Sequence, residues 1–518
     1  MKKKFNITGN CREGKHYMAD VSGKLAQTFG MVEEGEYFTI NRPRQYGKTT
    51  MLYILSDMLR KTEKYIVFNI SFEGIGDAIF NDEGVFSSGF VRILARYAGA
   101  YAPFMVNWLR EKATETDSLD KLSELISEMI SLTDKKVVLM IDEVDRSSNN
   151  QLFVSFLAML RNKYLESDTF MTFHSVILAG LYDVKSLKLK LRPDEEHKYN
   201  SPWNIAAEFN VDMNLQPREI KPMLDEYVRD KDVEMDTGFM SEKLFYYTSG
   251  YPFLVSKLCK MLDEDIMPLK TTKSWTETDM EVAIQQLIRQ HNTNFESLTK
   301  NLENHPALYD LVFKMLVLGE REDYNIYDPI VHLGLIHGIF RNGQGIRIHN
   351  RIYEEVIFHY MTSKTKSRLV FGEYNSQSFR LPENRLDIEA ILLRFQAFMR
   401  EQNSEKDRDF LERSGRLVFL AFLKPIINGS GYEFKEPQIS EEKRLDVMIT
   451  YFQHKYVAEL KIWRGETAHE KGMKQLADYL DRLALDEGYL LIFDHSKKKS
   501  RKSNWVTLGE KRLFEVWV

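Results

Sequence analysis

The sequence has little cysteine and no long apolar run. Only two cysteines, Cys11 and Cys259, occur among 518 residues, which excludes a secreted disulfide scaffold and any CxxC zinc spacing. The longest apolar run, Leu417–Leu423, is far shorter than the roughly 18 residues that a membrane span needs. The Met-Lys-Lys-Lys start is similar to the basic end of a signal peptide, but no apolar segment follows it in Phe5–Met18. These absences predict a soluble cytoplasmic protein that does not act at a membrane.

Neither sign of charge dominates the composition. Lysine and arginine total 71 and aspartate and glutamate 76, a formal net charge of -5, so a nucleic-acid surface must be a local patch. The 12 histidines show no HExxH spacing, and nothing in the sequence points to zinc, haem, flavin or covalent catalysis. With 43% hydrophobic and 12% aromatic residues the chain can build several cores, and its length suggests about three domains at roughly 150 residues each.

Changes in pattern define the expected domains, because no internal repeat or Pro/Gly/Ser-rich linker separates them. Residues 1–216 contain short β-rich runs that alternate with helical stretches, which predicts an α/β domain with a parallel sheet and crossover helices. Its four predicted strands are Glu36–Asn41, Tyr65–Ile70, Val137–Ile141 and Thr172–Leu178.

Residues 217–365 are mostly helical. They end in a predicted strand at Ile336–Phe340, a turn that contains Asn-Gly, a second strand at Ile346–His349 and a helix that starts at Asn350. This order suits a helical lid followed by a winged-helix-like module, whose hairpin is either a wing that contacts DNA through Arg341 and Arg347 or a domain-packing element.

Residues 366–518 predict a separate small α/β domain. Two helices, at about 385–402 and 406–423, come before its sheet. The predicted strands are Arg444–Tyr451, Tyr456–Lys461 and Gly488–Phe493, with a helix at about 467–485 between the last two.

A phosphate-binding loop is predicted after the first strand. The strand Tyr37–Asn41 is followed by Arg-Pro-Arg-Gln-Tyr-Gly-Lys-Thr-Thr and then by a helical pattern, the strand–loop–helix order in which backbone N–H groups cradle phosphate oxygens. Lys48 would reach the β- and γ-phosphates, and the Thr49 hydroxyl would ligate Mg²⁺. Arg42 stands where the usual motif GxxxxGK[ST] has its first glycine. The alternative is an ordinary helix start with a surface lysine.

A second element makes that alternative less attractive. The apolar run Val137–Ile141 ends in Asp142 and Glu143, so a buried strand delivers two carboxylates to the edge of the sheet where α/β ligands bind. Asp142 would hold Mg²⁺ through water and Glu143 would polarise the attacking water. The sequence thus predicts ATP and Mg²⁺ as cofactors. The predicted nucleotide-site residues are Arg44, Gly47, Lys48, Thr49, Thr50 and Asp142, with Glu143 as the catalytic residue.

The loop, together with Ile141-Asp-Glu-Val-Asp145, resembles that of the bacterial AAA-ATPase-like proteins, whose loop reads RPRRFGKS or close to it. In that family an arginine is expected at position 42. The resemblance covers roughly residues 10–220 and implies a P-loop ATPase, and such proteins commonly carry a PD-(D/E)XK-nuclease-like domain at the C-terminus. Gly250-Tyr-Pro252 is similar to the Gly-x-Pro element of STAND and origin-recognition-type ATPases, or is simply a helix-breaking turn.

Two further features of the ATPase remain open. Ala179-Gly180 occupies the strand end where a polar sensor residue is usual, which makes such a sensor doubtful. Arg161 or Arg192 is either an arginine finger for a neighbouring subunit in a homo-oligomer or a surface residue.

A carboxylate–lysine cluster is predicted near the C-terminus. Asp446 lies in one β-like run, and Glu459 and Lys461 lie in the next, where strand alternation puts the last two on the same face. Two carboxylates and a lysine suit a Mg²⁺ site for phosphodiester hydrolysis. Asp446 and Glu459 would bind the metal, and Lys461 would orient or deprotonate the attacking water. The alternative is a set of edge-strand charges.

This cluster resembles the restriction-endonuclease-like PD-(D/E)XK fold, although Leu445 replaces the literal proline of the motif. The family places another acid upstream, and both Glu412 and Glu436 qualify. Gln475 and Tyr479, four residues apart on the next helix, share a face with each other. The basic run Ser496–Ser503 either grips phosphates or is a solvated turn.

The leading hypothesis is therefore an ATP-binding and ATP-hydrolysing protein that controls a C-terminal Mg²⁺-dependent nuclease acting on DNA. The rival is an ATP-dependent nucleic-acid-binding or signalling switch whose C-terminal nuclease fold is inactive. A purely structural C-terminal domain is disfavoured, because clustered carboxylates without a metal repel one another.

Overall fold

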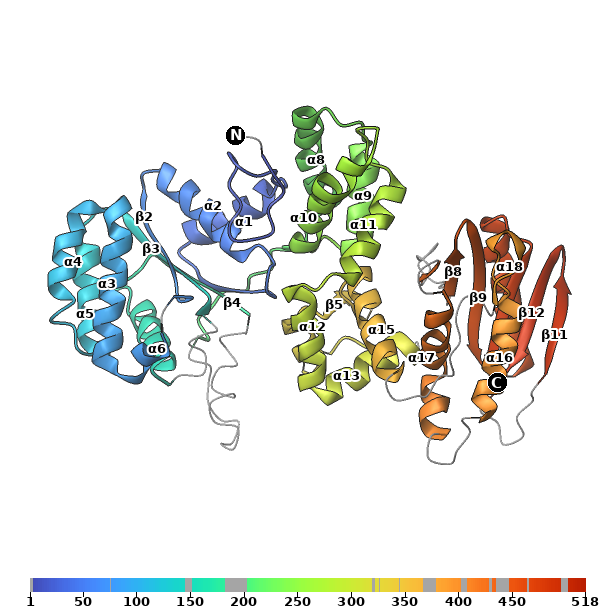
Figure 1. The fold of residues 1–518 in the computed structure, drawn as a ribbon. Helices are drawn as coiled ribbons and strands as arrows, with labels where there is room; N and C mark the ends of the chain where they lie inside the picture. The colour runs from blue at the N-terminus through green and yellow to red at the C-terminus, as the bar shows by residue number, and fades with distance from the viewer. Residues whose placement is uncertain are drawn as a thin grey trace. The chain divides into compact units, whose positions relative to one another are not determined.

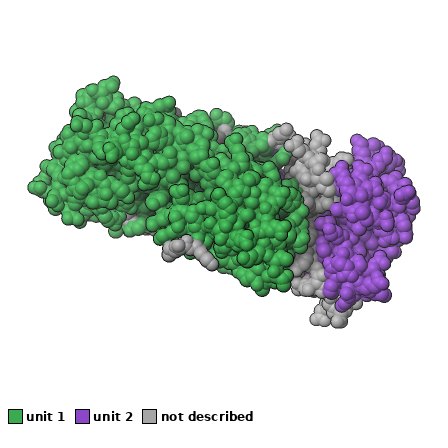
Figure 2. All heavy atoms as spheres, turned by 90° about the horizontal axis from the view of Figure 1, so that it is seen from above, with its two compact units in different colours: residues 1–308, 323–353 green, residues 309–322, 354–518 purple. Residues whose placement is uncertain are grey.

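The computed structural model describes residues 3–74, 76–144, 151–181, 203–318, 322–325, 327–343, 345–366, 379–401, 408–427, 431–434, 447–463, 465–494 and 502–518. The chain divides into two compact units, which Figure 2 shows in different colours. Unit 1 comprises residues 1–308 and 323–353, and unit 2 comprises residues 309–322 and 354–518. Within the described ranges, no helix is both long and apolar enough to cross a membrane.

Unit 1 is built on a four-stranded parallel sheet (Figure 1). Its strands are β1 (Tyr37–Asn41), β2 (Tyr65–Ser71), β3 (Lys136–Asp142) and β4 (Ser175–Gly180), in the order β1-β4-β3-β2. All three pairings are parallel. The central strands β3 and β4 are almost wholly buried, as expected for continuous apolar runs in a parallel sheet. The predicted α/β fold with a parallel sheet is confirmed.

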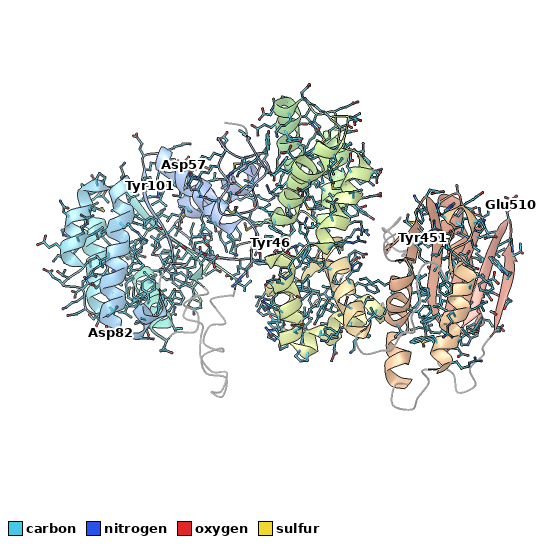
Figure 3. The ribbon with its side chains drawn as sticks, viewed as in Figure 1. Tyr46, Asp57, Asp82, Tyr101, Tyr451 and Glu510 are labelled. Carbon is cyan, nitrogen blue, oxygen red and sulfur yellow. The ribbon has the colours of Figure 1, made fainter. Side chains whose placement is uncertain are left out.

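Helices cover the two faces of this sheet (Figure 1). Alternate strand residues such as Phe68, Leu139 and Val176 form one core with the helices that follow β2 and β3. Two of these helices have side-chain N-caps, from Asp82 (Figure 3) and from Ser118. The helices of this part are α1 (Ser22–Glu33), α2 (Lys48–Lys61), α3 (Glu83–Tyr101), α4 (Val106–Lys112), α5 (Leu119–Ser131) and α6 (Gln151–Leu165).

The helical part of unit 1 follows the sheet along the chain. Its helices are α8 (Pro217–Lys231), α9 (Thr237–Thr248), α10 (Pro252–Met261), α11 (Glu277–Arg289), α12 (Thr293–Asn304) and α14 (Pro329–Ile336). The antiparallel hairpin of β5 (Phe340–Gly343) and β6 (Gly345–Ile348) then leads to α15 (Arg351–Lys366), whose N-terminus is capped by Asn350.

The hairpin begins later than the sequence pattern predicts. Ile336 ends α14 instead of starting a strand, and the chain turns at Gly338, which has a φ of 67°. Only glycine adopts this conformation readily, so the turn determines where the helix stops.

Unit 2 contains a six-stranded mixed sheet in the order β11-β12-β10-β9-β8-β7. The three expected strands are present as β8 (Val447–Tyr451), β9 (His454–Ile462) and β10 (Glu487–Phe493). The separate C-terminal α/β domain is thereby confirmed. Its main helices are α16 (Ile388–Glu401), α17 (Arg408–Ile427) and α18 (Glu466–Arg482), and α18 connects the parallel strands β9 and β10.

Three strands of this sheet have no counterpart among the predicted ones: β7 (Gly431–Phe434), β11 (Ser503–Leu508) and β12 (Lys511–Trp517). Half of the residues of β11 are polar and exposed, and its apolar residues do not alternate with them, so its sequence lacks a clear strand pattern. β12 pairs in parallel with β10, a non-local pairing that local sequence does not reveal.

Candidate nucleotide site and carboxylate–lysine site

The predicted phosphate loop connects β1 to α2. Gly47 directly precedes α2 and has a φ of 82°, and Gln45 has a φ of 58°. Both residues are in the left-handed region, where only glycine is free of strain. The loop therefore turns sharply and leads directly into the N-terminus of α2, whose first N–H groups point at a prospective phosphate.

Lys48 is the first residue of α2, and its side chain turns back toward the loop. Its side chain is buried, and its Nζ donates hydrogen bonds to the carbonyl oxygens of Arg42 (2.8 Å) and Pro43 (2.9 Å). These carbonyls hold the ammonium at the loop that would receive phosphates. The alternative, in which Lys48 is a solvated surface lysine, is incompatible with this burial.

Thr49 and Asp142 come together although they are far apart in the sequence. The Thr49 hydroxyl donates a hydrogen bond of 2.6 Å to Oδ2 of Asp142, the last residue of β3. Asp142 is buried, and its Oδ1 accepts the backbone N–H of Glu143 at 3.0 Å. Hydroxyl and carboxylate oxygens are the ligands that Mg²⁺ takes beside phosphates, so this donor set fits the ion.

Glu143 has a strained backbone, with a φ of 60°. A non-glycine residue in the left-handed region costs free energy, and such strain concentrates at functional sites. The remaining residue of the resemblance motif, Asp145, lies outside the described residues, as does Arg192. Arg161 is half-buried on α6.

Arg42, which stands where the usual phosphate-loop motif has its first glycine, has a structural role. Its guanidinium donates to the carbonyl of Asn41 (2.9 Å) and to that of Val211 (3.0 Å), and it lies over the ring of Phe209. Burial lowers the pKa of Arg42 from its ordinary value. Its own N–H donates to the carbonyl of Gly180 at 3.2 Å, at the strand end where a sensor residue was doubtful.

Arg44 and Thr50 contribute differently. The Arg44 side chain is exposed, whereas its carbonyl accepts a 2.6 Å hydrogen bond from the Tyr251 hydroxyl. The Thr50 hydroxyl accepts the backbone N–H of Cys11 at 3.0 Å, which ties the N-terminal segment to α2.

An apolar pocket of about 110 Å³ adjoins Gly47 and Thr50. Three parts of unit 1 line it, and sequence patterns gave no sign of it. The N-terminal segment contributes Met18, α2 contributes Met51 and Ile54, and the helical part contributes Leu215 and Pro252. The apolar lining suits a flat organic group placed next to the phosphate loop.

The Gly-x-Pro element forms part of this wall. Gly250 has a φ of 73°, and a β-carbon there would lie 2.2 Å from the carbonyl oxygen of Leu215. The Gly250 carbonyl accepts the Leu215 N–H at 2.8 Å, and Pro252 begins α10. The glycine therefore permits a close backbone approach that positions two pocket residues.

A buried hydrogen-bond chain joins the loop to the hairpin module, and sequence reasoning missed it. The Tyr46 hydroxyl contacts His349 Nε2 at 2.8 Å and donates to Oδ1 of Asn214 (Tyr46 is labelled in Figure 3). His349 Nδ1 lies 3.3 Å from the side-chain amide of Asn350. Burial, and then the positive charge of Arg341, lower the pKa of His349 to about 3. A neutral ring with its proton on Nε2 satisfies all of these contacts.

The candidate site in unit 2 contains Glu459 and Lys461 on one face of β9. Glu459 is fully buried, and its Oε1 lies 2.5 Å from Lys461 Nζ. α18 covers this face, because a β-carbon on its Gly472 would lie 3.4 Å from Cε of Lys461. Farther along α18, Gln475 donates a long hydrogen bond, 3.5 Å, to the Tyr479 hydroxyl.

The other predicted members of this site cannot be placed beside it. Asp446 and Glu436 lie outside the described residues, as do the side chain of Glu412 and most of the basic run Ser496–Ser503. In the part of the chain that the structure describes, no group of three or more His, Cys, Asp or Glu side chains is arranged to hold a metal ion.

Comparisons with known proteins bear on unit 1. A family described as the AAA-like domain matches residues 13–317. None of the curated proteins matches the chain.

Solved structures that match share little sequence with the chain. The Walker-type ATPase PABY2304 of Pyrococcus abyssi has 11% identity and a TM-score of 0.48, over 68% of this chain and 99% of that one. The RuvB Holliday junction branch migration motor of Thermotoga maritima has 14% identity and a TM-score of 0.33, over 66% and 95%. The ORC2 protein of Aeropyrum pernix, in ADPNP–ADP complexes, has 14% identity and a TM-score of 0.36, over 70% and 96%.

Proposed function

The chain belongs to the AAA-like domain family, and from this we propose that unit 1 binds ATP with Mg²⁺ and hydrolyses it. The contact between the Thr49 hydroxyl and Asp142 Oδ2 carries the proposal, because it joins the two halves of a Mg²⁺–phosphate site at 2.6 Å. Mg²⁺ would neutralise charge on the phosphate oxygens. The geometry of the phosphate loop and of Asp142 is thus the main support for ATPase activity.

The residues of unit 1 then have distinct roles. Lys48 exchanges its loop carbonyls for the β- and γ-phosphates, and Gly47 with the first turn of α2 supplies backbone N–H donors. Glu143 orients the attacking water and accepts its proton. The base of the nucleotide enters the apolar pocket between Met18, Ile54 and Leu215.

A nucleotide-binding assay tests this proposal. Fluorescent ATP is titrated into wild type, Lys48→Ala and the matched control Lys61→Ala, an exposed lysine on the same helix that pairs with Asp57. We expect Lys48→Ala to lose binding or hydrolysis and Lys61→Ala to retain both. Equal affinity of all three proteins for the fluorescent ATP would overturn the proposal.

For unit 2 we propose a Mg²⁺-dependent nuclease that acts on DNA, with Asp446 and Glu459 as metal ligands and Lys461 as the residue that orients the water. The buried Glu459–Lys461 pair supports it, since a fully buried carboxylate beside an ammonium is costly to keep for stability alone. The sheet order and the position of α18 agree with the resemblance to PD-(D/E)XK proteins. Asp446 directly precedes β8 in the sequence.

A cleavage assay tests the nuclease. Plasmid, linear and single-stranded DNA and RNA are incubated with Mg²⁺ or Mn²⁺, with and without ATP. Lys461→Ala should abolish cleavage, whereas Lys455→Ala, an exposed lysine of the same strand, should not. Loss in Lys48→Ala as well would establish control by nucleotide. Glu412→Gln and Glu436→Gln identify the upstream acid.

A second candidate function is a nucleotide-dependent switch without cleavage. The Tyr46–His349 contact favours it, because a tyrosine of the phosphate loop is bonded to the residue that precedes the cap of α15. The chain passes from unit 1 into the larger segment of unit 2 at Glu354, within this helix. Loop movement on nucleotide binding would thus reach α15 directly.

The switch predicts that Tyr46→Phe uncouples nucleotide from its response. ATP-dependent changes in DNA binding or oligomeric state should disappear in Tyr46→Phe but persist in the exposed-site control Tyr53→Phe. An unchanged response in Tyr46→Phe contradicts the switch. An arginine finger from Arg161 or Arg192 would require a homo-oligomer, which the same experiment detects.

For the domains of the chain we propose the boundaries 1–216, 217–365 and 366–518.

A further inference from the structure

An aromatic cluster lies beyond Lys461 on the same strand. Trp463 directly follows β9, and its N–H donates to the carbonyl of Phe493 at 2.9 Å, which extends the pairing with β10. Side chains alternate along a strand, so Glu459, Lys461 and Trp463 project from one face. Since α18 packs on Lys461 at Gly472, this is the face that α18 covers.

Three rings meet at this edge of the sheet. Trp463 and Trp517 have ring centroids 4.6 Å apart, and His469, in the first turns of α18, is 5.7 Å from each. We call Trp463, His469 and Trp517 the aromatic cluster. Trp517 is buried behind the other two, whereas Trp463 and His469 are half-buried and reach solvent.

Charged groups surround the aromatic cluster. His469 Nε2 lies 2.9 Å from Oε1 of the buried Glu515. Lys502 Nζ lies 4.4 Å from the Trp517 ring centroid. The indole N–H of Trp517 is buried, and no hydrogen-bond acceptor for it is found among the described residues.

The strand register relates the aromatic cluster to the proposed nuclease site. Lys461 pairs with Ile492, and Ile492 pairs with Trp517, so Trp517 lies two strands across the sheet from Lys461. Neighbouring strands are about 4.8 Å apart and residues about 3.3 Å apart along a strand, so Trp517 lies about 10 Å from Lys461 across the sheet and Trp463 about 7 Å from it along β9. The parallel strands β9, β10 and β12 all end here, which is the edge at which such sheets bind ligands.

We propose that Trp463 stacks on an unpaired base of a nucleic-acid strand beside the scissile phosphate, an inference that rests on the proposed nuclease function. Every base offers a π-face, so a tryptophan platform binds single strands with little sequence preference. Lys461, two residues before Trp463 on β9, and Lys502, over the Trp517 ring, supply cationic groups for the backbone. The substrate class is thus a single strand or a frayed end, because a paired base cannot reach the ring.

The test measures binding without cleavage. Fluorescein-labelled oligothymidylate, oligouridylate and a duplex of equal length are titrated into the full chain in EDTA. Trp463→Ala should weaken binding of the single strands about tenfold and of the duplex much less, whereas Trp463→Phe should keep most of the affinity. The matched control is Trp505→Leu, a tryptophan of β11 that packs on Phe514 and donates to Glu389. It should bind as wild type does.

A photocrosslink keeps the proposal testable if Trp463→Ala fails to fold. Wild type is irradiated with an oligonucleotide that carries 5-iododeoxyuridine, and the crosslinked peptide should contain Trp463. Crosslinks only elsewhere would overturn the proposal, as would unchanged single-strand affinity in a folded Trp463→Ala. A merely structural role predicts a lower unfolding midpoint in this variant with the affinity unchanged.

Cleavage measured in parallel separates this inference from the nuclease proposal. If wild type cuts DNA and Trp463→Ala binds single strands normally, the stacking site is wrong and the nuclease stands. If single strands bind through Trp463 but no substrate is cut with Mg²⁺ or Mn²⁺, the nuclease is wrong and the base-binding site stands. Absence of any nucleic-acid binding by wild type overturns the stacking site.

Discussion

The Thr49 hydroxyl donates a hydrogen bond of 2.6 Å to Oδ2 of Asp142, across 93 residues of sequence. Thr49 belongs to the helix that follows β1, and Asp142 ends β3. In the sheet β4 separates β1 from β3, so the contact forms only when the parallel sheet has its observed strand order. The relationship therefore couples the fold of unit 1 to the chemistry proposed for it.

Removal of either partner should abolish most ATP hydrolysis. A lost Mg²⁺ ligand forfeits several kcal/mol of charge stabilisation, so Thr49→Ala and Asp142→Asn should each lower the steady-state rate about a hundredfold. Thr49→Ser keeps the hydroxyl and should stay within about threefold of wild type. Because both residues serve one ion, the double variant should be little worse than either single one. Additive losses would argue against a shared ligand role.

Gly250→Ala should destabilise unit 1 by about 2 kcal/mol or more. The added β-carbon would lie 2.2 Å from the Leu215 carbonyl oxygen, and the φ of 73° disfavours any side chain. The free energy of unfolding from urea titration measures the loss. Gly99→Ala is the control, because Gly99 lies in α3 with open space around it and helical alanine should be neutral or stabilising by about 1 kcal/mol. Equal stability of both variants contradicts the close approach at Gly250.

His349 should make the protein less stable in mild acid. Burial depresses its folded pKa to about 3, below the ordinary value of 6.5, so the unfolded chain binds the extra proton between these two values. Stability from this residue is complete above pH 6.5 and falls as the pH is lowered toward 3. Lowering the pH from 7 to 5 should therefore reduce the free energy of unfolding by about 2 kcal/mol through this residue.

The measurement is urea unfolding of wild type and His349→Gln at both pH values. The variant should lose about 2 kcal/mol less than wild type over this interval. If the unfolding free energies of His349→Gln and wild type change equally between pH 7 and 5, His349 takes up its proton in the folded state over this interval.

Lys461→Met should destabilise unit 2 by about 3 kcal/mol, toward the lower end of the cost of breaking a buried ion pair, because the lysine side chain is 32% exposed. Glu459→Gln in the same background removes the buried charge and should restore much of the stability. It should not restore cleavage, since the proposed metal ligand is gone. A double variant no more stable than Lys461→Met, judged by thermal unfolding, would argue against a buried pair.

Much of unit 1 could be predicted from local patterns. The apolar runs at Tyr65–Ile70 and Val137–Ile141 are long enough and sufficiently rich in β-branched residues to identify buried parallel strands. Gly47 and Lys48 identify a strand-to-helix loop because few other residue pairs suit a left-handed turn that opens a helix. The sequence pattern places the start of the hairpin too early. An apolar residue such as Ile336 suits the end of a helix and the start of a strand equally well.

The prediction was weakest where distant segments meet. The strands β11 and β12 were missed because their pairing partners, and not their own sequences, make them strands. The shared face of Glu459 and Lys461 could be predicted because the two residues are two positions apart on one strand. The contact between Trp463 and Trp517 could not, because β10 lies between their strands.

The sequence by itself determined the elements of this protein and the chemistry available to them. The period of the apolar residues selects helix or strand, Gly47 permits the loop turn, and the residue types at Lys48, Thr49 and Asp142 suit a phosphate and Mg²⁺. Only the tertiary structure decided which of these groups meet. The Thr49–Asp142 contact, the pocket beside Gly47, the Tyr46–His349 bond and the aromatic cluster each join segments that are remote in the chain. Their proximity depends on strand order and helix packing, which follow from burial of the whole core and are not encoded in any one segment.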